Sequence, residues 1–220
     1  MHPVLRLYED VLSNAETVKF SLPPLPRFVF IVHGSAMIGE ENLSDGESWQ
    51  GERAVTVKPG PHGVTCWRWE LTRGDQGSTV AAAPGMMTHE KLTAFLETIP
   101  KGELLMRGDS VSFPPSGCAY THVHQGPGIR CVIEGALRID THGRSTSYGP
   151  GAAWYETGPD PVFAQAASDR PTRFIRVMIL PRALQGQSSI RYIKDEDKDR
   201  PKTQQYKIYA DAPISFEMKK

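Results

Sequence analysis

The chain has 220 residues, of which 39% are hydrophobic and 23% charged, a composition typical of a soluble globular protein with an apolar core. Lys plus Arg and Asp plus Glu number 25 each, so the charge gives no support to binding of nucleic acid or of an anionic membrane. The 20 glycines and 18 prolines indicate many turns, as short strands require.

Most apolar segments predict β-strands. In chain order these are Phe28–Val32, Ala54–Val57, Val64–Leu71, Ser110–Phe113, Ile129–Ile139 and Thr172–Leu180. Near the C-terminus, the mixed-charge run Lys194–Lys202 predicts a solvated loop, and Tyr206–Ala210 predicts a final strand. The pattern therefore favours an all-β protein.

One segment, Thr88–Ile99, predicts a short helix. Thr88 is a candidate N-cap, a glutamate lies in the first turn, and Pro100 ends the segment. The apolar residues have helical spacing, at Leu92, Phe95, Leu96 and Ile99. We expect this helix to follow a connection made of Gly74–Thr79 and Ala81–Gly85.

Three pairs of similar segments occur in the same order in the two halves of the chain. They are Val29–Ile38 with Arg130–Ile139, Gly46–Trp49 with Gly151–Trp154, and Trp67–Thr72 with Ile175–Leu180. Ordered similarity of this kind predicts a duplicated architecture of two units. The alternative is that short hairpins with glycine corners resemble each other by chance.

Two histidines one residue apart, His122 and His124, lie in the segment 117–135. On a strand, positions i and i+2 share one face, so the two imidazoles would lie side by side, as neighbouring ligands of one metal ion do. A short Gly/Pro turn, an apolar strand and the hairpin corner Glu134-Gly135 follow. This order resembles the first conserved motif of the cupin superfamily, small β-barrels that often hold a metal in the barrel mouth.

The resemblance implies a cupin fold, that is, a double-stranded β-helix or jelly-roll barrel. We expect two cupin-like units joined by the short helix. The first, residues 1–85, would be degenerate, because it has no counterpart of the histidine pair. The second, residues 86–190, would hold the ligand and metal site, and residues 191–220 would form a charged loop and a strand-like tail.

The chain also departs from the cupin pattern. Cupins usually carry a glutamate four residues after the second histidine, where this chain has Gly128. A second motif usually supplies another histidine, but the matching segment 151–165 contains none. Two of the four ligands that the resemblance implies are therefore missing.

The resemblance and strand alternation suggest which other side chains face the barrel interior. Tyr120 shares the face of the histidines, and Arg130 faces inward if the register of the family holds. An inward Arg130 would pair with a carboxylate such as Glu156 or bind an anionic ligand, since a guanidinium matches a carboxylate in geometry. The alternative is a register slip that turns Arg130 to solvent.

A metal site needs a third protein ligand, and Glu156 is the best candidate. Two histidines and one carboxylate suffice for Fe(II), and Zn, Mn or Ni are further candidates. The alternative is a hydrogen-bonded histidine pair without metal. Tyr120 and Glu156 are the candidates for proton transfer, and Arg130, Gln165 and Trp154 for substrate binding.

Three functions remain open. The first is a metal-dependent isomerase, lyase or dioxygenase that acts on a small organic acid, or a related metabolite, held by Arg130. The second is a non-catalytic cupin that binds or senses a small molecule, and the third is an interaction protein whose first unit serves dimerisation. We expect a homodimer in each case, because exposed sheet edges need cover.

We expect a cytoplasmic protein. The first ten residues have no apolar core of signal-peptide length, and no window approaches the roughly 18 apolar residues of a membrane span. The three cysteines, Cys66, Cys118 and Cys131, show no CxxC spacing, so a disulfide framework is not expected.

Overall fold

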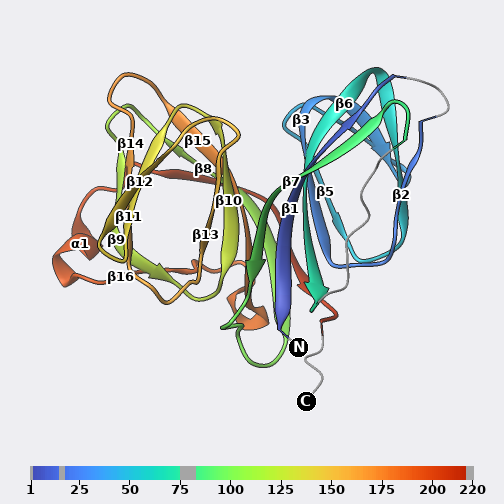
Figure 1. Ribbon diagram of the computed structural model, residues 1–220. Helices are drawn as coiled ribbons and strands as arrows, with labels where there is room; N and C mark the ends of the chain where they lie inside the picture. Colours follow the sequence, from blue (N-terminus) through green and yellow to red (C-terminus); the bar gives the residue numbers. More distant parts are fainter. Residues whose placement is uncertain (1, 15–17, 75–82, 217–220) are drawn as a thin grey trace. The chain divides into compact units, whose positions relative to one another are not determined.

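The computed structural model describes residues 2–14, 18–74 and 83–216 (Figure 1). The chain is almost entirely β-structure, as predicted, and it divides into two units. Unit 1 comprises Met1–Leu96 and Ile214–Lys220, and unit 2 comprises Glu97–Pro213. Within the described residues, no helix has the length and apolar character needed to cross a membrane.

Unit 1 is built on one antiparallel sheet in the order β4-β3-β6-β1-β7, with β2 paired to β6 and β5 paired to β3. The strands are β1 (Pro3–Leu12), β2 (Phe20–Leu22), β3 (Arg27–Ile38), β4 (Glu41–Ser44), β5 (Ser48–Gly51), β6 (Val55–Arg73) and β7 (Met86–Phe95). The sheet surrounds an apolar core that includes Phe20, Val29, Ile31 and Trp49.

The helix predicted at Thr88–Ile99 is wrong. Residues Met86–Phe95 form β7, which pairs antiparallel with β1 from Leu12↔Met86 to Val4↔Phe95. Long-range backbone pairing with β1 therefore overrides a helical spacing of apolar side chains, of which Leu92 is only partly buried and Phe95 is exposed. The same pairing assigns β7 to unit 1, so the units divide between Leu96 and Glu97 rather than after Gly85. Part of the predicted connection, residues 75–82, lies outside the described residues.

Unit 2 is a barrel of two five-stranded antiparallel sheets, ordered β13-β10-β15-β8-β17 and β12-β11-β14-β9-β16 (Figure 1). The first sheet contains β8 (Leu104–Phe113), β10 (Gly128–Glu134), β13 (Ala153–Glu156), β15 (Thr172–Pro181) and β17 (Gln205–Ile214). The second contains β9 (Cys118–His124), β11 (Leu137–Thr141), β12 (Arg144–Tyr148), β14 (Val162–Ala166) and β16 (Ile190–Tyr192).

Apolar side chains from both sheets form the core of the unit 2 barrel. The apolar core includes Val111, Val132, Ile139, Trp154 and Phe174, drawn from both sheets. Alternation along β14 shows how the pattern arises, because Val162, Ala164 and Ala166 are buried while the residues between them are only partly buried.

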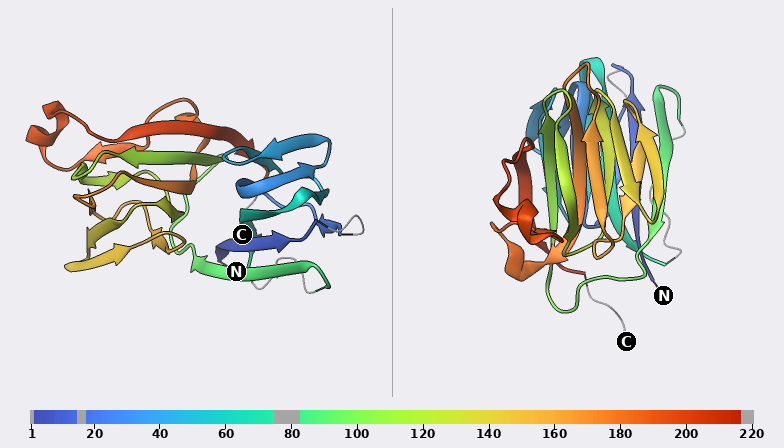
Figure 2. Two further views of the ribbon diagram at one scale, coloured as in Figure 1. Left: turned by 90° about the horizontal axis from the view of Figure 1, so that it is seen from above. Right: turned by 90° about the vertical axis from the view of Figure 1, so that its left-hand side faces the viewer.

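The connection from β15 to β17 contains the only helices of the described chain. A 3₁₀ turn η1 (Arg182–Leu184) and the strand β16 precede the five-residue helix α1 (Asp195–Asp199). The run Lys194–Lys202, predicted as a loop, therefore includes a short helix, which lies at the outside of unit 2 (Figures 1 and 2). The predicted final strand is confirmed as β17.

The two units share a strand register at the segments that the sequence aligned. In unit 1, Val29 lies between Trp49 on β5 and Arg68 on β6. The corresponding residues of unit 2 are Arg130, Trp154 and Arg176. The hairpin corners match as well: Gly34 and Gly135 both have positive φ, and a Cβ at either would lie 2.2 Å from a carbonyl oxygen.

Candidate functional site

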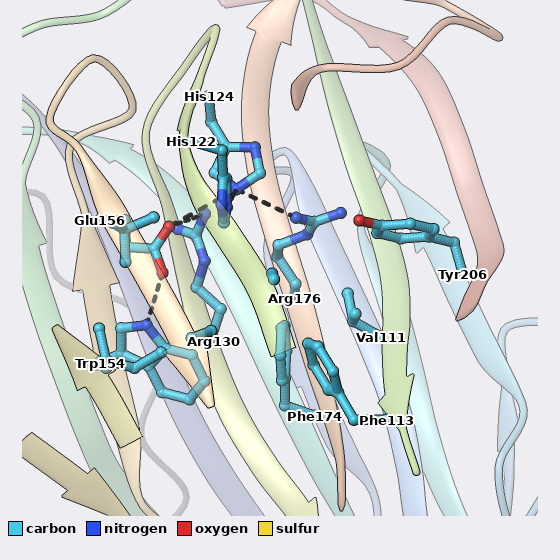
Figure 3. Close-up of a pocket in the computed structure, with 14 residues that line it drawn as sticks. Val111, Phe113, His122, His124, Arg130, Trp154, Glu156, Phe174, Arg176 and Tyr206 are labelled. Carbon is cyan, nitrogen blue, oxygen red and sulfur yellow. Dashed lines mark hydrogen bonds and ion pairs between the residues drawn. The ribbon is translucent and has the colours of Figure 1, made fainter. Parts of the chain in front are cut away.

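A small pocket lies inside the unit 2 barrel, lined by side chains from both sheets (Figure 3). Apolar residues, among them Phe113, Trp154 and Phe174, form part of its wall. The polar lining consists of His122, His124, Arg130, Glu156, Arg176 and Tyr206. The volume inside is about 20 Å³, which is room for about one water molecule.

Both histidines of the predicted motif point into this pocket. His122 and His124 lie on β9 and are 4% and 5% exposed. Their Nε2 atoms are 3.2 Å apart, and their rings are nearly perpendicular. The i, i+2 spacing therefore does what strand alternation predicts, and brings two imidazoles to one point.

The hydrogen-bond partners assign the tautomer of the His122 ring. His122 Nδ1 lies 2.7 Å from the carbonyl oxygen of Tyr120, so it must carry the proton and donate, which leaves a lone pair on Nε2. His124 Nε2 has two neighbours: it lies 3.2 Å from His122 Nε2, toward which it would donate, and 3.4 Å from Arg176 Nη1, from which it would accept. The lone pair of His122 Nε2 therefore faces His124 Nε2 across a short distance.

Both rings are neutral at neutral pH. Burial lowers the pKa of His122, although the nearby Glu156 carboxylate partly opposes this. Burial lowers the pKa of His124 well below its ordinary value near 6.5, and the positive charge of Arg176 acts in the same direction. Neutral imidazole is the form in which histidine binds a metal.

Arg130 faces the barrel interior, and the alternative of a register slip is wrong. Its side chain is buried, with Nη2 2.7 Å from Glu156 Oε2 and Nη1 donating to the carbonyl of Gly128 at 2.6 Å. Trp154 Nε1 donates to the other oxygen of Glu156 at 2.8 Å. Burial lowers the pKa of Arg130 to about 10, partly offset by Glu156, so the guanidinium stays charged at neutral pH.

The structure explains why the expected glutamate is missing at position 128. A Cβ on Gly128 would lie 2.4 Å from the carbonyl oxygen of Val177 on the adjacent strand β15, so no side chain fits. Glu156 on β13 is the register partner of Gly128, and its carboxylate enters the same pocket from the neighbouring strand. Its Oε2 lies 3.8 Å from His124 Nε2.

Arg176 on β15 is a pocket residue that the sequence reasoning missed. It forms a bidentate ion pair with Asp109 on β8, at 2.9 and 2.6 Å. The sequence repeat could have indicated Arg176, because it is equivalent to Arg68 in the alignment of the two halves. Arg68 likewise pairs with a buried aspartate, Asp10. The Arg–Asp pair is therefore common to both units, whereas Arg130 and the histidine pair occur in unit 2 alone.

Two predicted site residues do not reach the pocket. β9 contains one extra residue relative to β14 between Ala119 and His122, a β-bulge that turns Ala119 inward in place of Tyr120. The Tyr120 ring instead lies outside, next to the cationic side chains of Arg200 and Lys202. Gln165 also points outward, and its amide donates to the carbonyls of Ser116 and Gly117.

Tyr206 is the tyrosine that the pocket does contain. It comes from β17, the strand-like tail of the sequence, and its ring lies 5.8 Å from the guanidinium carbon of Arg176. Figure 3 shows its hydroxyl directed toward Arg176. Trp154 lines the pocket as predicted.

The donor set fits a metal ion in part. Two nitrogen ligands about 2.1 Å from one ion lie about 3.0 Å apart in octahedral and about 3.4 Å apart in tetrahedral geometry, and the observed separation is 3.2 Å. Glu156 Oε2, at 3.8 Å from His124 Nε2, would have to move closer to share that ion. Among residues 2–14, 18–74 and 83–216, no three His, Cys, Asp or Glu side chains form a complete metal cluster.

Neither a family model nor a curated protein sequence matches the chain. Solved structures do. A cupin 2 conserved barrel domain protein from Leptotrichia buccalis matches with a TM-score of 0.50 and 10% identity, over 81% of this chain and 84% of its own. An oxalate decarboxylase from Bacillus subtilis with Mn(II) centres matches with a TM-score of 0.57 and 10% identity, over 86% and 71% of the two chains.

A third match is a salicylate 1,2-dioxygenase from Pseudaminobacter salicylatoxidans, with a TM-score of 0.55 and 12% identity, over 92% of this chain and 75% of its own. The fold of this chain is therefore that of the cupin superfamily, as the segment around His122 and His124 predicted. Identities this low define the fold and leave the reaction to be argued from the pocket.

Proposed function

We propose that unit 2 is a metal-dependent cupin enzyme acting on a small organic acid. The observation that carries the proposal is the pair of Nε2 atoms of His122 and His124, whose separation of 3.2 Å fits two nitrogen ligands of one metal ion. Glu156 supplies the third donor, and Fe, Zn, Mn or Ni are the candidate metals. When bound, such an ion supplies a Lewis acid that polarises a substrate oxygen.

Charge in the pocket favours an anionic substrate. The formal charges of Arg130 and Arg176 are cancelled by those of Glu156 and Asp109, and both histidines are neutral. A divalent cation adds two positive charges, which an organic acid would offset. The oxalate decarboxylase and salicylate dioxygenase matches support this substrate class, since both are named for carboxylate substrates.

The residues of the pocket then have distinct roles. Arg130 binds a carboxylate of the substrate through its guanidinium. Glu156, held by Arg130 and Trp154, would accept a proton, and the hydroxyl of Tyr206, which is directed toward Arg176, would donate one. Isomerase, lyase and dioxygenase chemistry all fit such an arrangement, and the fold does not select among them. Because the volume is about 20 Å³, only the reacting end of a substrate fits without movement of the walls.

Metal analysis tests the proposal. Protein purified without chelator should contain one transition metal ion per chain, and stripped protein should bind Co²⁺. The variants His122→Ala and His124→Ala should each weaken Co²⁺ binding by at least about 100-fold. His142→Ala, which changes an exposed histidine in the β11–β12 hairpin, is the matched control and should bind as the native protein does. Metal-free native protein that fails to bind Co²⁺ would refute the proposal.

A specific observation favours a second function, a non-catalytic cupin that binds a small anion without metal. Two guanidinium groups lie near the histidines, each paired with one carboxylate, and guanidinium N–H groups are good donors to an anion. Glu156 already has two partners, Arg130 and Trp154. This function predicts formate binding that depends on Arg130 and is unchanged by removal of metal, which isothermal calorimetry in the presence of EDTA would measure.

A further inference from the structure

The segment Ile190–Gln204, which we call the strap, runs beside the strand that carries the histidines. Its strand β16 pairs with β9, with Tyr192 opposite His122 and Ile190 opposite His124. The rings of Tyr192 and His122 lie 6.3 Å apart. The remainder of the strap contains α1 and ends immediately before β17.

The strap holds the bulge that precedes His122. Ile193 N donates to the carbonyl of Thr121 at 3.1 Å. Thr203 Oγ1 accepts from Cys118 N at 3.0 Å and donates to the Cys118 carbonyl at 3.2 Å. The strap thus binds the backbone on both sides of Tyr120, at the point where β9 departs from regular pairing with β14.

Lys202 contacts the backbone of the strap and two tyrosine rings. Its ammonium lies 4.3 Å from the ring centre of Tyr192 and 5.4 Å from that of Tyr120. The ammonium donates to three backbone carbonyls, those of Asp197, Lys198 and Arg200. A lysine ammonium has three protons, so these carbonyls can use its full donor capacity.

One hydrogen bond links the bulge to the pocket. The carbonyl of Tyr120 accepts from His122 Nδ1 at 2.7 Å, and this bond fixes which ring nitrogen carries the proton. We propose that Lys202 is a positioning residue: by holding Tyr120 within the bulge, it keeps the His122 Nε2 lone pair aimed into the pocket. The effect of Lys202 on metal affinity rests on the proposed function, whereas its effect on the tautomer of His122 can be tested without metal.

Two measurements on the full chain test the proposal. In metal-free protein, the ¹⁵N shifts of the His122 side chain should show the Nδ1–H tautomer, and Lys202→Met should convert it to a mixture of tautomers. In the Co²⁺ titration, Lys202→Met should weaken binding by about 10-fold, as loss of an outer partner of a ligating histidine does. Lys202→Arg keeps the positive charge and should restore most of the affinity.

The matched control is Lys198→Met, which changes an exposed lysine of the same strap whose ammonium pairs with Asp195. It should leave the tautomer and the affinity unchanged. Should Lys202→Met fail to fold, Tyr192→Leu removes the nearer ring and should give the same two effects. A single Nδ1–H tautomer in folded Lys202→Met or Tyr192→Leu overturns the inference. If the native protein does not bind Co²⁺, the proposed function is refuted. The measured tautomer of His122 then still tests the role of Lys202.

Discussion

Gly128 and Glu156 are register partners on the neighbouring strands β10 and β13. Gly128 occupies the position where the cupin pattern has a glutamate, and Glu156 carries a carboxylate into the pocket from the adjacent strand. Residues opposite each other in a sheet project from the same face, so either of two register partners can direct a carboxylate into the same pocket. The close approach of β15 leaves no room for a side chain at position 128.

The first prediction concerns that close approach. Gly128→Ala should lower the free energy of unfolding by about 1–3 kcal/mol, because its Cβ overlaps the backbone of β15. The control is Gly149→Ala, where no atom lies within 4 Å of the added carbon, and it should leave the stability unchanged. Urea denaturation measures both. Equal stability of the two variants would contradict the overlap.

The second prediction concerns the ion pair of Arg130 and Glu156. Glu156→Gln leaves a buried guanidinium without its counter-charge and should lower the free energy of unfolding by about 3 kcal/mol. Adding Arg130→Met to that variant should recover most of the loss, since the uncompensated charge is then gone. A double-mutant cycle by urea denaturation measures the coupling, and strictly additive effects would argue against the pair.

The third prediction concerns pH and metal-free protein. Folding lowers the pKa of His122 and of His124, so the unfolded chain binds their protons first as the pH falls. Stability is therefore complete above about pH 6.5 and decreases below it, by at most about 1.4 kcal/mol per pH unit for each histidine. Urea midpoints at pH 7.5, 6 and 5 in EDTA measure this. The double variant His122→Gln, His124→Gln should show a shallower decrease, and an identical slope would refute the assignment.

The fourth prediction separates the two tyrosines. Formate added to the Co²⁺-loaded protein should change the Co²⁺ absorption spectrum as it enters the pocket. Tyr206→Phe should weaken formate binding by about 5-fold, the worth of one hydrogen bond. Tyr120→Phe is the matched control and should bind formate normally, because that ring lies outside the barrel. The reverse order of effects would show that Tyr120 serves the pocket.

Strand alternation was sufficient to predict that His122 and His124 share one face, and both line the pocket. The inward position of Arg130 was predicted only through the register of the cupin family, and Trp154 was a candidate for substrate binding without an argument from alternation. Strand alternation gave the wrong face for Tyr120, because one extra residue in β9 reverses the alternation. A single sequence does not reveal such a bulge. The prediction that Gln165 binds substrate was wrong for a related reason. Its face depends on how β14 pairs with β9 and β11, which is a long-range property.

Long-range pairing also explains the other differences. The segment Thr88–Ile99 has helical spacing, and pairing with β1 makes a strand of its residues up to Phe95. Arg176 was read as part of an apolar strand because its partner Asp109 lies far away in the sequence. Tyr206 joins the pocket because β17 is the last strand of a sheet that also contains β8 and β15.

The pocket has room for about one water molecule, and this small size affects the rate at which a ligand binds. Molecules larger than that enter only when a wall moves aside, and Tyr206 is the wall residue that is nearly half exposed. The frequency of that motion, and not the rate of diffusion, then limits how fast a guest arrives and how long it stays. A bulky substitution beside Tyr206 would therefore slow arrival and departure together and leave the equilibrium occupancy almost unaltered.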